Sequence, residues 1–120
     1  MSNKLFFETN NMQWDTVGEG VSRQIMGYDD KIMLVHMKFA KDAVGALHTH
    51  PHSQTSYIVK GSFEVTVGEK KQILASGDSF YAPPNELHGV LCLEEGVLID
   101  VFSPKRDDFL DGEKLSYYGK

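Results

Sequence analysis

Residues 45–61 read GALHTHPHSQTSYIVKG and carry the strongest structural signal in the chain. His48 and His50 are two positions apart, so in an extended strand both imidazoles lie on the same face. That spacing lets one strand offer two nitrogen ligands to one metal ion. Pro51 then interrupts the strand and turns the chain, so that Gln54 approaches from the next segment as a third ligand.

A second segment, Pro83-Pro84-Asn85-Glu86-Leu87-His88-Gly89, offers His88 as the fourth ligand. The predicted cofactor is one divalent metal ion, and these ligand types suit nickel, zinc, copper, iron or manganese without choosing among them. The alternative is that the histidines only cluster in a polar loop and that Gln54 binds a water. His52 has the same parity as His50, but Pro51 separates them, so we expect His52 beside the ligands or on the surface.

Length and charge limit the possible functions. The chain has 120 residues, which predicts one domain over 1–120 with a core at about 14–103 and an extension at 104–120. The net charge is −5 and the only arginines are Arg23 and Arg106, so a nucleic-acid partner is not expected. A small anionic substrate stays possible, because one metal ion and one arginine can outweigh a diffuse negative field.

The expected location is the cytoplasm. No apolar run approaches the roughly 20 residues that span a bilayer, and the N-terminal apolar patch is too short for a signal peptide. The single cysteine, Cys92, agrees with a reducing compartment. We read Cys92 as a small apolar filler and His36 as an exposed or sheet-face histidine.

Short alternating segments between glycine-rich turns predict an all-β protein, an antiparallel barrel or jelly roll. Strands are expected at residues 21–26, 31–39, 56–60, 62–67, 71–75, 79–82, 87–93 and 97–103. The clearest is 31–39, with Met33, Val35, Met37 and Phe39 on one face. We expect a hairpin around Gly61, a turn at 94–96, and a short helix or turn at 106–110.

Asp100 interrupts an otherwise apolar strand and shares its face with Leu98 and Phe102. A buried carboxylate is costly unless it is paired or functional, so Asp100 is a candidate general acid or base, with Phe102 as a pocket wall. Arg106, just beyond Pro104, could clamp a carboxylate bidentately. The alternatives are a solvent-facing Asp100 at a sheet edge and a surface Arg106.

The two histidine segments resemble the motifs of the cupin superfamily, G-x5-H-x-H-x3,4-E-x6-G and G-x5-P-x-G-x2-H-x3-N. The first motif holds at His48, His50 and Gly61, with Gln54 in the acidic slot; Gly45 stands three residues before His48 instead of six. The second motif holds at Gly77, Pro83 and His88, without its middle glycine and final asparagine. The resemblance implies a single cupin domain, a double-stranded β-helix or jelly-roll barrel.

Three longer stretches, at residues 48–54, 77–89 and 98–110, resemble the pectin-degradation (KdgF-type) cupins. The third lies outside the general cupin motifs and therefore discriminates best. This resemblance implies an enzyme that linearises 4,5-unsaturated monouronates from pectin or alginate into the 4-deoxy-5-keto form. It implies metal ligation by His48, His50, Gln54 and His88, and a substrate pocket with Asp100, Phe102 and Arg106.

Two other functions remain open at this stage. A metal-dependent dioxygenase on the same barrel would consume oxygen and generally need iron; Gln54, in the place of a carboxylate, argues against it. A non-catalytic sugar-sensing module would not need Asp100 and Arg106 beside the metal. We also expect a homodimer, because the exposed strands of a small barrel need covering.

Overall fold

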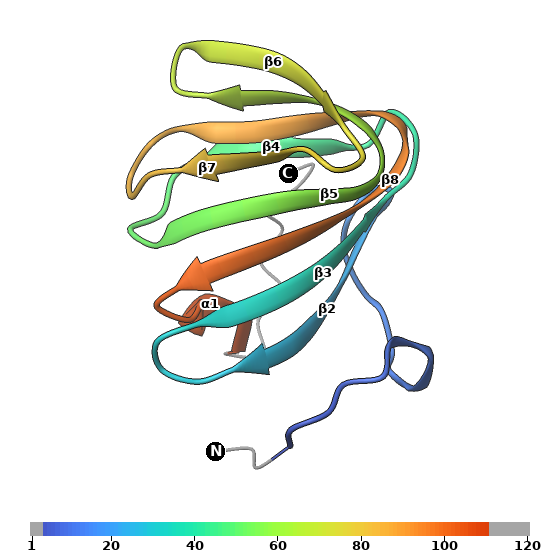
Figure 1. Ribbon diagram of the computed structural model, residues 1–120, viewed down its shortest axis with the longest axis vertical. Coiled ribbons are helices and arrows are strands. Elements are labelled where there is room, and N and C mark those ends of the chain that lie inside the picture. The colour runs from blue at the N-terminus through green and yellow to red at the C-terminus, as the bar shows by residue number, and fades with distance from the viewer. Residues whose placement is uncertain (1–3, 111–120) are drawn as a thin grey trace.

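The fold is built on two long strands, β5 (Ser53–Val67) and β8 (His88–Ser103), in a computed structural model that describes residues 4–110. These strands pair antiparallel along their whole length, from Ser53 opposite Ser103 to Val67 opposite His88. Both bend at the same side of the molecule, the right-hand side of Figure 1, so the sheet folds back on itself. The pair therefore contributes to both halves of the barrel.

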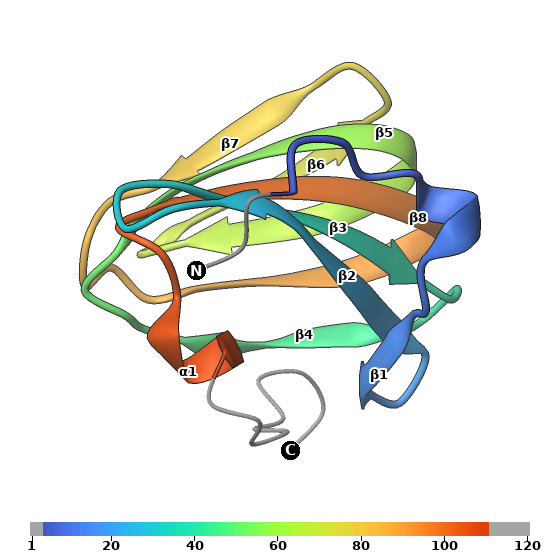
Figure 2. The same ribbon diagram turned by 90° about the horizontal axis from the view of Figure 1, so that it is seen from below.

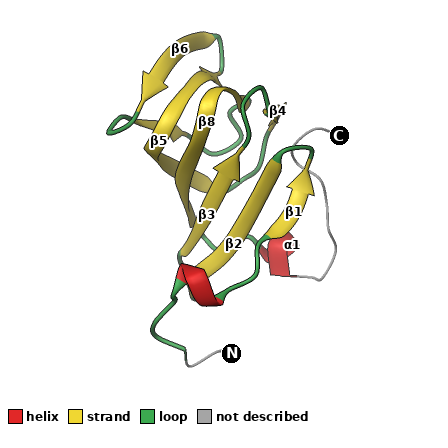
Figure 3. Ribbon diagram, turned by 90° about the vertical axis from the view of Figure 1, so that its right-hand side faces the viewer, coloured by secondary structure: helices red, strands yellow, loops and turns green. Residues whose placement is uncertain are grey.

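The other strands attach to this pair in one continuous hydrogen-bonded sheet. Its main order is β1-β2-β3-β8-β5-β6, while β4 pairs with β8 and β7 pairs with β5. The remaining elements are η1 (Thr9–Asn11), β1 (Asp15–Gly18), β2 (Val21–Tyr28), β3 (Met33–Phe39), β4 (Val44–His48), β6 (Lys70–Ala75), β7 (Ser79–Ala82) and α1 (Asp107–Leu110). Figure 3 shows the strands dominating the molecule, with β2 beside β3. Within residues 4–110, no helix is long and apolar enough to cross a membrane.

The core follows the alternation in the sequence. The four apolar side chains predicted on one face of β3 are all buried. Inward side chains of the two long strands meet them across the barrel, and the rings of Phe39 and Phe63 pack edge to face at 5.3 Å. The cluster also includes Val17, Val21, Ile58, Val65, Cys92, Leu98 and Phe102. Burial of this apolar face is the main force that closes the barrel.

Two turns predicted from glycine-containing segments are wrong. Gly61 does not turn a hairpin, and residues 94–96 do not separate two strands, because β5 and β8 run continuously through these positions. Gly61 instead lies at the shared bend, where the β5–β8 register shifts. Its φ is +85°, and a Cβ there would lie 2.5 Å from the carbonyl oxygen of Glu94. Glycine therefore allows two backbones to come close at a bend.

The helix expected near residue 106 is confirmed as α1, which begins at Asp107. Figure 2 shows α1 directly after β8, at the same end of the barrel as the connection from β4 to β5. Phe109 fixes the helix there: its buried ring packs edge to face on Phe102 at 5.7 Å. The guanidinium of Arg23 on β2 lies 3.8 Å from the centre of the Phe109 ring.

Replacing Gly61 by alanine should destabilise the fold more than the same change at Gly77. Both residues have a positive φ, which costs an alanine about 1–2 kcal/mol. Only Gly61 also faces backbone atoms, since nothing lies within 4 Å of a Cβ built on Gly77. We expect Gly61→Ala to lower the free energy of unfolding, measured in urea, by about 1–3 kcal/mol more than Gly77→Ala does. Equal losses for the two variants would show that the close approach at the bend is unimportant.

Candidate metal centre and active site

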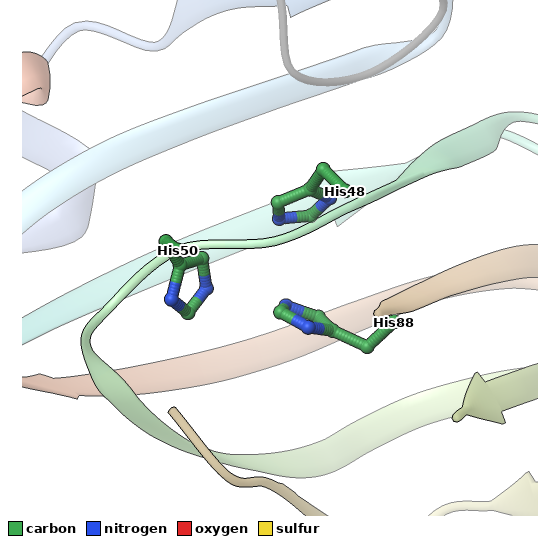
Figure 4. Close-up of side chains that lie close together, drawn as sticks. All are labelled: His48, His50 and His88. Carbon is green, nitrogen blue, oxygen red and sulfur yellow. The ribbon is translucent and has the colours of Figure 1, made fainter. Parts of the chain in front are cut away.

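Three histidines converge at the open end of the barrel, opposite the bend of β5 and β8. His48 ends β4, His88 begins β8, and the two are register partners. The imidazole of His50 completes the group, and Figure 4 shows the three rings facing a common point. One nitrogen from each ring lies within 4.8 Å of the others, so the three could hold a metal ion.

The prediction that one strand carries both His48 and His50 is wrong in its details. Strand β4 ends at His48, and His50 lies in the connection to β5. The backbone of His50 is held there because its carbonyl accepts a 2.7 Å hydrogen bond from the N–H of Asn85. Asn85 precedes His88 in the loop before β8, so this bond ties the two histidine segments together.

Backbone carbonyls fix the tautomer of all three rings. The Nδ1 atoms of His48, His50 and His88 lie 2.7, 3.1 and 2.9 Å from the carbonyl oxygens of residues 46, 52 and 86. A carbonyl only accepts, so each Nδ1 carries the proton and each Nε2 keeps a lone pair. Burial supports the neutral form, because it lowers the pKa of His48 and His50 to about 4 and also lowers that of His88.

The side-chain oxygen of Gln54 faces the same point. Its Oε1 lies 2.9 Å from Nε2 of His50 and 3.1 Å from Nε2 of His88. Its amide nitrogen points away and donates to the Ser56 hydroxyl at 2.9 Å. The oxygen and the neutral imidazole nitrogens are all acceptors, so these contacts have no proton to share. A cation between them removes the repulsion, and neutral nitrogen and amide oxygen are suitable ligands for a divalent metal.

Asp100 is buried, with 2% of its surface exposed, and points into the barrel with Leu98 and Phe102. The solvent-facing alternative is therefore wrong. Burial raises the pKa of Asp100 to about 6, although the hydrogen bond from Ser56 and the charge of Arg106 both act to lower it. Asp100 lines a cavity of about 20 Å³ together with two of the histidines and Gln54. That volume admits an ion or a water molecule.

Arg106 is also buried, with 1% of its surface exposed, so the surface alternative is wrong for this residue too. Its Nε and Nη2 donate to the two carboxylate oxygens of Asp108 at 3.1 and 2.9 Å. Its guanidinium lies 5.0 Å from the ring centre of Phe102, and that ring contacts the imidazole of His50 at 5.7 Å. One aromatic ring thus separates the positive charge of Arg106 from the histidine cluster, and this charge contributes to the low pKa of His50.

The remaining candidates lie outside the cluster. His52 is half-buried, with its ring 5.4 Å from that of His50. The Nδ1 atom of His36 lies 3.1 Å from Oε1 of Gln24, and the His36 ring packs on the ring of Trp14. Cys92 is buried in the core, where burial raises the pKa of its thiol. These positions agree with the structural roles expected for His36 and Cys92.

Sequence reasoning missed two residues beside the site. Ser56 joins Gln54 to Asp100 through hydrogen bonds, and Asp108 fixes the plane of the Arg106 guanidinium. Ser56 is two positions from Gln54 and begins the strand predicted at 56–60, and this spacing could have pointed to it. The pairing of Asp108 depends on the path of the chain after β8, which no local pattern specifies.

An antiparallel barrel with histidines gathered at its open end is a cupin arrangement, and the sequence agrees. Residues 35–102 match the family described as Cupin domain. That match spans more than half of the chain, so the protein belongs to the cupin family.

Its relatives point to one branch of this family. The pectin degradation protein KdgF of Dickeya dadantii (strain 3937) is 48% identical over 107 residues, which cover 88% of this chain and 97% of the relative. The structure of KdgF from Halomonas sp. superimposes with a TM-score of 0.86 at 39% identity, covering 89% of this chain and 99% of the other. The crystal structure of an RmlC-like cupin from Shewanella frigidimarina NCIMB 400 also superimposes with a TM-score of 0.86. The two chains are 41% identical, and the match covers 89% of this chain and 96% of the other. The resemblance to KdgF-type cupins is therefore confirmed.

Removing any one imidazole of the cluster should weaken metal binding. We expect His48→Ala, His50→Ala and His88→Ala each to lose at least about 100-fold in affinity for zinc, because each deletes a nitrogen that faces the common point. Isothermal titration of metal-free protein measures this, and binding should also raise the melting temperature of the wild type. His52→Ala is the matched control, because His50 is held by the backbone carbonyl of residue 52 and not by its ring. An equal loss in this control, or none in His88→Ala, would contradict the assignment.

Proposed function

We propose that this protein opens the ring of 4,5-unsaturated monouronates and converts them to the linear 4-deoxy-5-keto form. The similarity to the pectin degradation protein KdgF over most of both chains supports this reaction. The observation that carries the proposal is the position of Asp100. A buried carboxylate shares one small cavity with His48, Gln54 and His88, so a proton acceptor adjoins a site for positive charge.

Four residues would hold the cofactor in this proposal: His48, His50, Gln54 and His88. When bound, a divalent ion supplies a Lewis acid that stabilises negative charge on a substrate oxygen. None of the four side chains is an anion, because the imidazoles are neutral and Gln54 is an amide, so the ion would keep most of its charge. These ligand types suit nickel, zinc, copper, iron or manganese and do not choose among them.

Asp100 would move the proton. In an unsaturated uronate, C1 carries a hydroxyl and is bonded to the ring oxygen, which is also attached to the C4–C5 double bond. Asp100 takes the proton of the C1 hydroxyl, the bond between C1 and the ring oxygen breaks, and C1 becomes an aldehyde. The electron pair stays on the former ring oxygen as an enolate, and Asp100 returns the proton to C4. The product is an isomer of the substrate, and no oxidant or reductant is consumed. A carboxyl pKa of about 6 suits both transfers near neutral pH.

Arg106 and Phe102 would place the sugar. The cavity of about 20 Å³ is far smaller than a sugar, so the ring would bind at the open end with its reacting atoms directed inward. Arg106 would attract the substrate carboxylate through its positive charge, and Asp108 holds its guanidinium in one plane. Phe102, between Arg106 and His50, would form the wall against which the ring packs.

The reaction is tested with unsaturated monouronates prepared separately from pectin and from alginate. We expect metal-loaded protein to accelerate the loss of their ultraviolet absorbance and the appearance of the open chain in the proton spectrum. Chelation should abolish this effect. Asp100→Asn should bind metal as the wild type does but lose about 10²–10⁴-fold in turnover, because the amide cannot accept the proton.

Unchanged turnover in Asp100→Asn would remove this residue from the mechanism. Oxygen consumption measured with an electrode would instead indicate a dioxygenase, and binding of uronates without turnover would indicate a sensing module. The source that gives the faster reaction would distinguish pectin from alginate degradation.

The homodimer and the cytoplasmic location remain predictions. We propose that two copies meet through the outer face of β5 and β7, where Tyr57, Val59 and Tyr81 keep 48%, 43% and 57% of their surface exposed. Large apolar side chains gathered on one sheet face are typical of interaction surfaces. Sedimentation velocity should show twice the 13.5 kDa mass of the chain. Tyr57→Glu should yield a monomer, and a wild-type monomer at micromolar concentration would refute the proposal.

A further inference from the structure

Ser56 lies between the site of positive charge and the buried carboxylate. It is two positions from Gln54 on β5, so both side chains point into the barrel, and 1% of its surface is exposed. Its Oγ donates to Oδ1 of Asp100 at 2.5 Å and accepts from the amide nitrogen of Gln54 at 2.9 Å. The same amide nitrogen lies 3.5 Å from Oδ1 of Asp100.

The direction of these hydrogen bonds is determined by proton count. A hydroxyl has one proton, and a carboxylate only accepts, so the proton of Ser56 is directed to Asp100. Toward Gln54, the Ser56 oxygen can therefore only accept. The amide of Gln54 must turn its nitrogen to Ser56, and its oxygen then faces His50 and His88.

The reversed amide would be unfavourable beside Ser56 and would block a cation beside the histidines. Its oxygen would face the Ser56 oxygen and the Asp100 carboxylate, so three acceptors would share one proton. Its N–H groups would face the Nε2 lone pairs of His50 and His88 and would occupy them with hydrogen bonds. A site with a reversed amide would present donors to a cation. A carboxylate at position 54 would not have this problem, because both of its oxygens are acceptors.

We propose that Ser56 is a positioning residue that fixes the amide of Gln54 with its oxygen toward the metal. The inference rests on the metal site of the proposed function and deepens it. It joins the ligand set to the proton-transfer residue, because one hydroxyl satisfies Asp100 and orients Gln54. The use of glutamine as a metal ligand would then depend on a serine two residues later in the same strand.

Cobalt(II) tests the inference, because its affinity and its visible absorption spectrum both report on the ligands without any substrate. We expect Ser56→Ala to weaken cobalt binding about 10–100-fold and to change the spectrum, because the amide is no longer held in one orientation. Ser56→Thr keeps the hydroxyl and should stay within about 3-fold of the wild type. Thr55→Ala is the matched control, since it removes a hydroxyl from the exposed face of the same strand. Urea unfolding of each variant checks that the fold is retained.

A double substitution separates orientation from simple packing. With Gln54→Glu in place, the side chain offers an oxygen to the metal in either orientation, so adding Ser56→Ala should cost less than about 3-fold in cobalt affinity. The same loss in both backgrounds, or wild-type affinity and spectrum in Ser56→Ala alone, would overturn the inference. If the wild-type protein does not bind cobalt, both the role of Ser56 and the proposed metal site are refuted. A wild type that binds cobalt but turns over no uronate would refute the proposed reaction and leave the assignment of Ser56 intact.

Discussion

Four acceptor atoms meet at the open end of this barrel with no proton between them. Three are imidazole nitrogens whose protons are on the opposite side of the ring, and the fourth is the amide oxygen of Gln54. Like partial charges at about 3 Å repel, and burial strengthens the repulsion because little water is present to screen it. A cation at the centre would make the arrangement favourable, which is the physical argument for the proposed metal site.

The pairing of β5 with β8 brings these atoms together. Because the two strands bend together and run antiparallel, both ends of β8 and the start of β5 lie at the same end of the barrel. The histidine that begins β8 thus lies near Asp100, which is close to the other end of the same strand. Arg106 lies in the short link between β8 and helix α1, beside the Phe102 ring. Residues separated by as many as 58 positions in sequence, such as His48 and Arg106, thereby share one electrostatic environment.

The sequence predicted the parts of this arrangement that depend on local periodicity. Alternation placed Met33 and Phe39 in the core and Asp100 on an inward face. The segment at residues 83–89 offered His88 as a partner of the histidine pair, and the cupin motifs agreed with this. The continuity of β5 and β8 could not be predicted in this way, because Gly61 looks the same in a turn and at a bend. Its close approach to Glu94 is a long-range contact. The partners of Ser56 and Asp108 were missed for the same reason, since they depend on which side chains face each other across the barrel.

The most direct test of the convergence is the anomalous scattering of crystals grown from zinc-loaded protein, recorded on both sides of the zinc absorption edge. We predict a single strong peak at about 2.0–2.2 Å from the Nε2 atoms of His48, His50 and His88 and from the oxygen of Gln54. A peak held by other residues would contradict the assignment. So would a site without zinc in which the amide nitrogen of Gln54 faces the histidines.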